Sequence, residues 1–170
     1  MFDILPASAV PADVTLPPEL LDARVRGREL FRALPDTPER NSVLNALGRI
    51  GKSNLKGKIR HRAEPILHAL GDRFEDLLSV VDEAVDCRNH YVHGNSPSYD
   101  YASNFFETVA FFTDTLEFVF GASDLMQSGW DIRAWSLRGT SRSHCFGAYC
   151  DSYKERLAKL QALRGNPKAT

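Results

Sequence analysis

The chain has 170 residues, of which 43% are hydrophobic and 25% are charged, and its formal net charge is −1. These values are typical of a globular domain that is long enough to bury a core. No apolar run approaches the roughly 20 residues of a membrane span, and no basic-then-apolar segment resembles a secretory signal. The three cysteines follow no disulfide-like spacing, so we expect a cytoplasmic protein with no membrane partner.

The first third of the chain predicts an irregular arm and two helices. Residues 1–16 contain two prolines and no hydrophobic period, as in an arm or a linker. A helix is expected over residues 17–34, where Pro35 ends it. Thr37 is a favourable N-cap for a second helix, which should end near Gly51.

The middle of the chain predicts two more helices. The helix of residues 55–70 contains Pro65, which should kink or split it. Asp72 is expected to cap the following helix, and Gly94 is a favourable left-handed terminator. The predicted buried stripe of that helix consists of Phe74, Leu77, Leu78, Val81, Val85, Arg88 and Val92.

Arg88 stands where this stripe requires an aliphatic residue. Charged side chains rarely enter a buried seam unless something pairs with them. The expected partner of Arg88 is a carboxylate such as Glu107 or Asp114, a second subunit, or a phosphate.

The last third predicts a central helix, a connection and a final helix. Residues 99–120 are apolar on more than one side, as in a helix at the centre of a fold or covered by a second subunit. Residues 121–142 are rich in Gly and Ser and are expected to form a long connection to a helix over residues 143–164. With no repeats and no strand alternation, the sequence predicts an all-α bundle of five or six helices, as a single domain over residues 17–166.

One motif at the end of the fourth predicted helix resembles that of a known family. Arg88 is followed by a polar residue, Asn89, and then by His93 at the sixth position. This spacing resembles the motif of the HEPN superfamily of small helical ribonucleases, in which Arg is followed by four to six residues and then by His. Arg88, Asn89 and His93 are the residues that the resemblance identifies as catalytic.

More of the chain resembles one branch of that superfamily. The aromatic residues 99–120 and the segment of residues 144–163 are similar to the branch associated with the ApeA abortive-infection protein. This resemblance covers roughly residues 40 to 165. It implies a HEPN-type bundle that dimerises through its motif helices, and a role in phage defence or in a toxin–antitoxin system.

The motif suits metal-independent cleavage of RNA. The 2′-hydroxyl of RNA is the nucleophile, so cleavage needs its deprotonation, stabilisation of the phosphorane and protonation of the leaving 5′-oxygen. Histidine suits the proton transfers, and we expect His93 to act as base or acid. Arg88 would bind the scissile phosphate through its planar, permanently charged group, and Asn89 would position one or both. Such an endoribonuclease needs no cofactor and leaves a 2′,3′-cyclic phosphate.

The spacing of Arg88 and His93 bears on the oligomeric state. Five residues correspond to about 140° around a helix, so we do not expect one helix to bring both side chains onto one phosphate. The resemblance implies a homodimer with a composite active site, and two-fold pairing is the commonest arrangement of soluble oligomers.

A basic stretch precedes the motif. Residues 49–63 contain six cations and no acid, whereas residues 71–124 contain eleven acids and two arginines. Such a stretch can attract RNA phosphates with an affinity that falls as salt rises, although a solvated helix face is the alternative. The predicted RNA-binding residues are Lys52, Lys56, Lys58, Arg60 and Arg62.

Three other hypotheses compete with the ribonuclease. Cys87, His90 and His93 are spaced i, i+3 and i+6, but they lack the tight pairs of structural zinc sites, so no metal is expected. The chain could instead be a non-catalytic HEPN module that binds nucleotides or RNA, or docks a larger defence protein. A nucleotidyltransferase partner could also modify Tyr91 within the motif. An antitoxin or an upstream sensor domain is a further expected partner.

Overall fold

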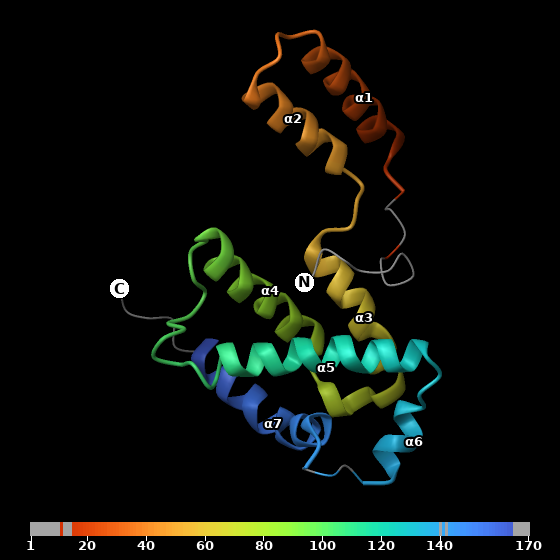
Figure 1. Ribbon diagram of the computed structural model, residues 1–170, viewed down its shortest axis with the longest axis vertical. Coiled ribbons are helices and arrows are strands. Elements are labelled where there is room, and N and C mark those ends of the chain that lie inside the picture. Colours follow the sequence, from red (N-terminus) through yellow and green to blue (C-terminus); the bar gives the residue numbers. More distant parts are fainter. Residues whose placement is uncertain (1–10, 12–14, 140, 142, 165–170) are drawn as a thin grey trace. The chain divides into compact units, whose positions relative to one another are not determined.

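The computed structural model describes residues 11, 15–139, 141 and 143–164 (Figure 1). Within these ranges the chain forms seven α-helices, one short 3₁₀ helix and no strand, which confirms the predicted all-α class. None of these helices combines the length and the apolar composition of a membrane span. The elements are α1 (Pro18–Arg32), α2 (Pro38–Arg49), α3 (Leu55–Leu70), η2 (Gly71–Phe74), α4 (Leu77–His93), α5 (Val109–Gln127), α6 (Ile132–Leu137) and α7 (Cys145–Arg164).

The chain divides into two compact units, with the boundary between Asn54 and Leu55. The domain expected over residues 17–166 spans parts of both units. Most of the arm expected at residues 1–16 lies outside the described residues.

The N-terminal unit is a pair of helices, α1 and α2, with no fully buried residue in either. Thr37 caps α2 as predicted, because its Oγ1 accepts a hydrogen bond from the Arg40 backbone N–H at 3.2 Å. Arginines from each helix hold the pair together: Arg40 Nε donates to the Phe31 carbonyl at 2.9 Å, and Arg24 Nη1 donates to the Ile50 carbonyl at 3.0 Å. Backbone carbonyls, rather than an apolar core, therefore join these two helices.

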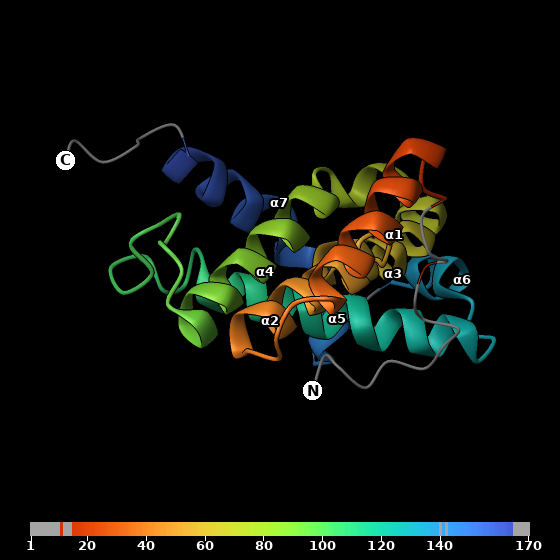
Figure 2. The same ribbon diagram turned by 90° about the horizontal axis from the view of Figure 1, so that it is seen from above.

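The C-terminal unit contains the core. Helix α5 packs against α3, α4 and α7 (Figures 1 and 2). These helices enclose a cluster of buried rings. Phe74 lies at the centre of the cluster, with ring centroids 5.2 Å from Phe118 and 4.9 Å from Tyr153. The Tyr153 hydroxyl donates to the Glu75 carbonyl at 2.6 Å, so the polar end of this buried ring is satisfied. The cluster holds α7 against the segment that leads into α4.

The predicted helix over residues 99–120 is wrong at its start. Residues 101–108 form turns, and α5 begins at Val109 and continues to Gln127. Some helix-type bonds remain here, since the Asn104 N–H donates to the Asp100 carbonyl and the Thr108 N–H to the Asn104 carbonyl, both at 3.0 Å. The Ala110 N–H, however, donates to the Phe105 carbonyl five residues back, so the regular ladder is interrupted before α5.

The connection expected over residues 121–142 is also wrong, because most of it is helical. Asp131 caps α6 by accepting from the Ala134 N–H at 2.8 Å, and Ile132 is buried in the core. The rings of Trp130 and Trp135 lie 5.1 Å apart.

The predicted start of the motif helix is wrong and its predicted end is confirmed. Asp72 lies within η2 and does not cap α4, which begins after Asp76 in a left-handed conformation with φ of 56°. Gly94 ends α4 with φ of 69°, as predicted, and its N–H donates to the His90 carbonyl at 2.9 Å. Pro65 lies inside α3 and does not divide it.

Candidate functional site

The last two turns of α4 bring three polar side chains of the motif together. Arg88 Nη1 donates to Asn89 Oδ1 at 3.1 Å and lies 3.0 Å from His93 Nε2. One helix thus brings Arg88 and His93 into contact, while their joint approach to one phosphate stays a prediction. Their Cα positions differ by about 140° around the axis, but the arginine side chain is long enough to reach along the helix end to His93.

The contact bears on the tautomer of His93. A guanidinium has donors and no acceptor, so a hydrogen bond between the two groups requires Nε2 of His93 to be the acceptor, as in the tautomer with its proton on Nδ1. Nε2 thus lies beside a permanent positive charge. When Arg88 turns to a phosphate, Nε2 is free to take a proton from a hydroxyl while the charge stabilises the phosphate.

The motif side chains are open to solvent. Arg88 and Asn89 are half-buried and His93 is exposed. The predicted buried stripe is wrong at its end, because Val92 is 55% exposed. The buried residues of α4 are Leu77, Val80, Val81, Ala84, Val85 and Cys87, so the buried face ends nearly two turns before His93.

No carboxylate of the described residues pairs with Arg88. Asp114, one of the two acids expected to pair with it, accepts instead from Arg156 Nη1 at 2.6 Å. Within the described residues no acid lies in ion-pair range of Arg88, whose hydrogen bonds go to Asn89 and His93. Its guanidinium is therefore accessible to an added anion.

Acids of α4 pair with two of the predicted basic residues of α3. Lys56 pairs with Asp86 at 2.7 Å and Arg60 pairs with Asp82, both acids of α4. Lys58 is half-buried in the same unit as these pairs, and Lys52 is exposed in the N-terminal unit.

Arg62 does not belong in the predicted RNA-binding set. It is only 3% exposed, it donates to Asp124 of α5, and its guanidinium lies 4.8 Å from the centroid of the Phe120 ring. The charge of Arg62, which was expected to bind phosphate, is thus already paired with an acid and an aromatic ring face. Arg62 serves packing between α3 and α5.

A hollow of about 900 Å³ lies beside the motif, entirely within the C-terminal unit. Sequence reasoning did not find it, because its walls come from α4, the segment after α4, and the end of α7. The lining residues that matter below are Glu83, His90, Tyr91, Tyr99, Tyr101 and Arg164. The only sequence signal was the spacing of two tyrosines, Tyr99 and Tyr101, shortly after the motif.

Glu83 is the centre of a hydrogen-bonded group in the hollow. Glu83 accepts from the Tyr99 hydroxyl at 2.6 Å and from Arg164 Nη2 at 2.5 Å. Burial, followed by the bond to Glu83, raises the pKa of Tyr99 to about 12, so its hydroxyl remains a donor at neutral pH.

The described residues contain no group of three or more His, Cys, Asp or Glu side chains placed to hold a metal ion. Cys87 is buried, whereas His93 at the other end of the proposed zinc set is exposed. Burial also raises the pKa of the Cys87 thiol, which disfavours the thiolate that a metal would need.

A sequence model of the family described as Apea-like HEPN matches residues 12–133, a range that includes all of α4 and its motif. The chain belongs to the Apea-like HEPN family. Neither a curated protein nor a solved structure matches the chain. Membership in this family suggests a nuclease or a defence-related module.

The extent of the HEPN match differs from the expected range of about residues 40 to 165. The match begins earlier, so it includes both helices of the N-terminal unit, and it ends within α6. The expected similarity over residues 144–163 is outside it, although α7 packs against α5 and η2 in the structure.

Proposed function

We propose that this HEPN protein is a metal-independent endoribonuclease. The observation that carries the proposal is the 3.0 Å contact between Arg88 Nη1 and His93 Nε2, in a site with no competing carboxylate among the described residues. An anion binder and an imidazole at hydrogen-bond distance are the two groups that attack by a 2′-hydroxyl requires.

The proposed reaction proceeds by transfer of the phosphorus from one ribose oxygen to another. His93 Nε2 removes the 2′-hydroxyl proton as the bond between O2′ and phosphorus forms. Arg88 binds the non-bridging oxygens, whose negative charge grows in the transition state. The bond from phosphorus to O5′ then breaks, and the products are a 2′,3′-cyclic phosphate and a protonated 5′-hydroxyl.

Asn89 acts as a positioning residue in this scheme. Its Oδ1 accepts from Arg88 Nη1, which restrains the guanidinium toward the helix end. We expect its loss to weaken the orientation of Arg88 rather than to remove a reacting group.

We further propose that the active form is a homodimer. Attack and departure occur on opposite sides of phosphorus, so one imidazole beside the attacking oxygen is badly placed to protonate the leaving oxygen. The His93 of a second copy would supply that proton across a two-fold axis. Light scattering at micromolar concentration should report twice the chain mass of 19.0 kDa; a strictly monomeric protein that still cleaves RNA would contradict the composite site.

The proposed chemistry can be tested with labelled RNA in excess EDTA. Wild type should cleave RNA and leave cyclic-phosphate ends, and a substrate with a 2′-deoxy sugar at the cleaved position should be inert. The double variant Arg88→Ala/His93→Ala should be inactive, and it also reports any contaminating ribonuclease. The matched control is His61→Ala, because His61 is a partly exposed histidine of α3 outside the motif.

Two results would contradict this function. Cleavage of the 2′-deoxy substrate would show that the nucleophile is not the 2′-hydroxyl. RNA binding by wild type without any cleavage would favour a non-catalytic HEPN module.

We propose phage defence or growth arrest as the setting, consistent with the defence-related character of the family. Expression of wild type should then slow bacterial growth, whereas expression of the double variant should not. Equal growth of the two strains would count against an unrestrained toxin and direct attention to a silencing antitoxin or sensor domain.

The acids of α4 should limit RNA affinity. Because Asp82 and Asp86 neutralise Arg60 and Lys56, the variant Asp82→Asn/Asp86→Asn should bind single-stranded RNA more tightly. Two added phosphate contacts correspond to about a 10-fold gain at low salt and a steeper salt dependence. Fluorescence anisotropy measures both quantities.

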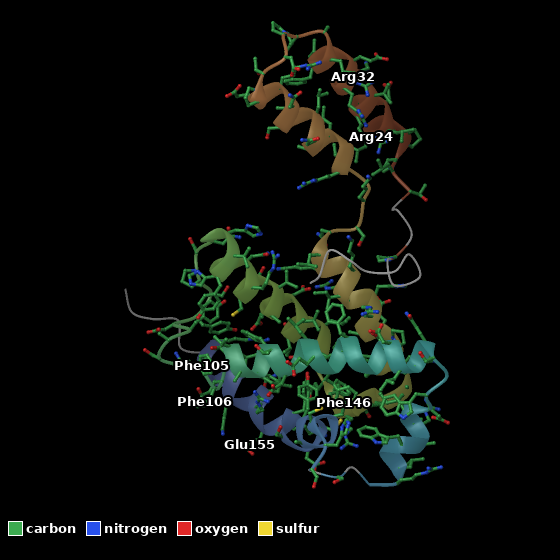
Figure 3. All side chains as sticks on the ribbon, in the orientation of Figure 1. Arg24, Arg32, Phe105, Phe106, Phe146 and Glu155 are labelled. Atoms are coloured by element: carbon green, nitrogen blue, oxygen red, sulfur yellow. The ribbon has the colours of Figure 1, made fainter. Side chains whose placement is uncertain are left out.

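The control for this prediction is Glu155→Gln on α7, labelled in Figure 3. It frees Lys159, which Glu155 contacts at 2.7 Å, without adding charge along α3. An equal gain in the control would show that only net charge matters and that α3 is not part of the RNA-binding surface.

A further inference from the structure

The hollow beside the HEPN motif is walled by a cluster of four aromatic rings. The Tyr91 ring lies 5.0 Å from His90 and 5.8 Å from Tyr101, and the Tyr101 ring lies 6.1 Å from Tyr99. Tyr91 is 60% exposed, whereas Tyr101 is only 4% exposed. The cluster therefore ends in one accessible aromatic face supported by buried rings, as in a stacking platform for a flat ligand.

The charges of the hollow suit an uncharged ligand rather than a phosphate. Its one arginine, Arg164, is paired with Glu83, and Asp100 accepts from both the backbone and the hydroxyl of Ser103. With two acids against one paired cation, an anion entering the hollow would be repelled. A phosphate group is better placed at Arg88, which no described acid neutralises.

Two donor atoms at the hollow are buried. The Tyr101 hydroxyl is enclosed beside Ser98 and the Cys87 thiol, and Arg164 Nε has no hydrogen-bond partner among the described residues. Burial raises the pKa of Tyr101 to about 12, so its hydroxyl carries a proton to donate. Both donor atoms are enclosed, so the recognition of a flat ligand is carried by the exposed Tyr91 ring rather than by these donors.

The hollow and the motif are adjacent on one helix. His90, which lines the hollow, precedes His93 by three residues, or about 4.5 Å along the axis of α4. A ligand whose flat group enters the hollow would therefore present its neighbouring atoms to the motif.

We propose that the hollow binds a nucleobase that flanks the scissile phosphate, with Tyr91 as its stacking partner, and that the substrate is consequently single-stranded RNA. This inference rests on the proposed ribonuclease function and extends it to substrate recognition. A base in a duplex is stacked and paired, so it cannot enter a pocket, whereas a base in a loop or an end can. The phosphate beside the bound base would lie at Arg88 and His93.

The test measures binding with RNA that cannot be cleaved. Fluorescence anisotropy of a 2′-O-methyl single-stranded oligonucleotide should show about a 10-fold loss of affinity for Tyr91→Ala, as expected for one base stacked on one ring. Tyr91→Phe keeps the ring and should retain wild-type affinity. Phe106→Ala is the matched control, because Phe106 is a 75% exposed aromatic residue that does not line the hollow (Figure 3).

Removal of the base from the ligand completes the test. A set of oligonucleotides is used, each with one abasic position. For one of them, removal of the base should weaken binding to wild type about 10-fold, and the same removal should leave binding to Tyr91→Ala unchanged. Three outcomes would each overturn the base site. These are equal affinities of wild type and Tyr91→Ala, free-energy losses from the Tyr91→Ala change and from base removal that simply add, and no binding of RNA by wild type.

Cleavage assays on the same variants separate this inference from the ribonuclease proposal. If wild type cleaves RNA without metal and the Tyr91→Ala variant binds RNA with wild-type affinity, only the base site would be overturned. Binding that depends on Tyr91 without any cleavage would overturn only the ribonuclease proposal.

Discussion

Replacement of Arg88 by lysine is expected to lower the rate of RNA cleavage about 100-fold or more, the usual loss for one preorganised donor to a developing oxyanion. Lysine keeps the charge but loses the planar fork that donates to two phosphate oxygens. It also cannot reproduce the geometry in which one guanidinium nitrogen contacts both Asn89 and His93. Single-turnover cleavage of labelled RNA measures this effect on the chemical step.

The same variant should leave stability almost unchanged. Arg88 forms no ion pair with a described acid, and its partner His93 is exposed, so little stabilisation is lost with the side chain. Arg60→Lys is the matched control, because Arg60 is an exposed arginine of the same unit whose partner is Asp82. A melting temperature that falls together with the cleavage rate of Arg88→Lys would instead support a structural role for Arg88.

Replacement of Phe74 by alanine is expected to destabilise the C-terminal unit by about 3–5 kcal/mol, the usual range for a large buried ring. Phe74 is fully buried, and its ring lies within 6 Å of the rings of Phe118, Tyr149 and Tyr153. These neighbours belong to α5 and α7. Loss of the Phe74 ring would leave a cavity between them and would loosen the contacts that hold α5 and α7 against the segment leading into α4. Since a domain is typically stable by about 5–15 kcal/mol, this loss is a large part of the total. Chemical denaturation followed by circular dichroism measures it.

The control for Phe74 is Phe106→Ala in the segment before α5 (Figure 3). Phe106 is an exposed phenylalanine whose ring contacts only Phe105 among the described ring pairs, so its loss should change stability by less than about 0.5 kcal/mol. Similar losses in the two variants would mean that the rings around Phe74 do not form the core.

The outcomes along the chain show which features local sequence can predict. Thr37 and Gly94 were predictable because an N-cap hydroxyl and a left-handed glycine act on backbone groups within a few residues. Residues 101–108 have the apolar content of a helix but form turns, with an i→i+5 bond from Ala110 to Phe105 where the regular ladder is interrupted. Apolar periodicity alone does not predict at which residue a regular helix begins.

The candidate site likewise has features that local sequence predicts and features that it does not. Arg88, Asn89 and His93 were recognisable as a motif, because their spacing along one helix is a property of the sequence. Their mutual contact was not, since it depends on the conformation of the arginine side chain at a free helix end. For Arg62 the decisive partner is Asp124, which lies 62 residues further along the chain and becomes a neighbour only when α3 packs on α5.

The sequence by itself determined the all-α class, the end of the motif helix and the HEPN motif, because helical periodicity, capping and spacing are interactions between residues close in the chain. Only the tertiary structure decided that Arg62 is buried, that Lys56 and Arg60 are neutralised by α4, and that an aromatic hollow adjoins the motif. Each of these depends on which helices face one another, and therefore on partners that are far apart in sequence.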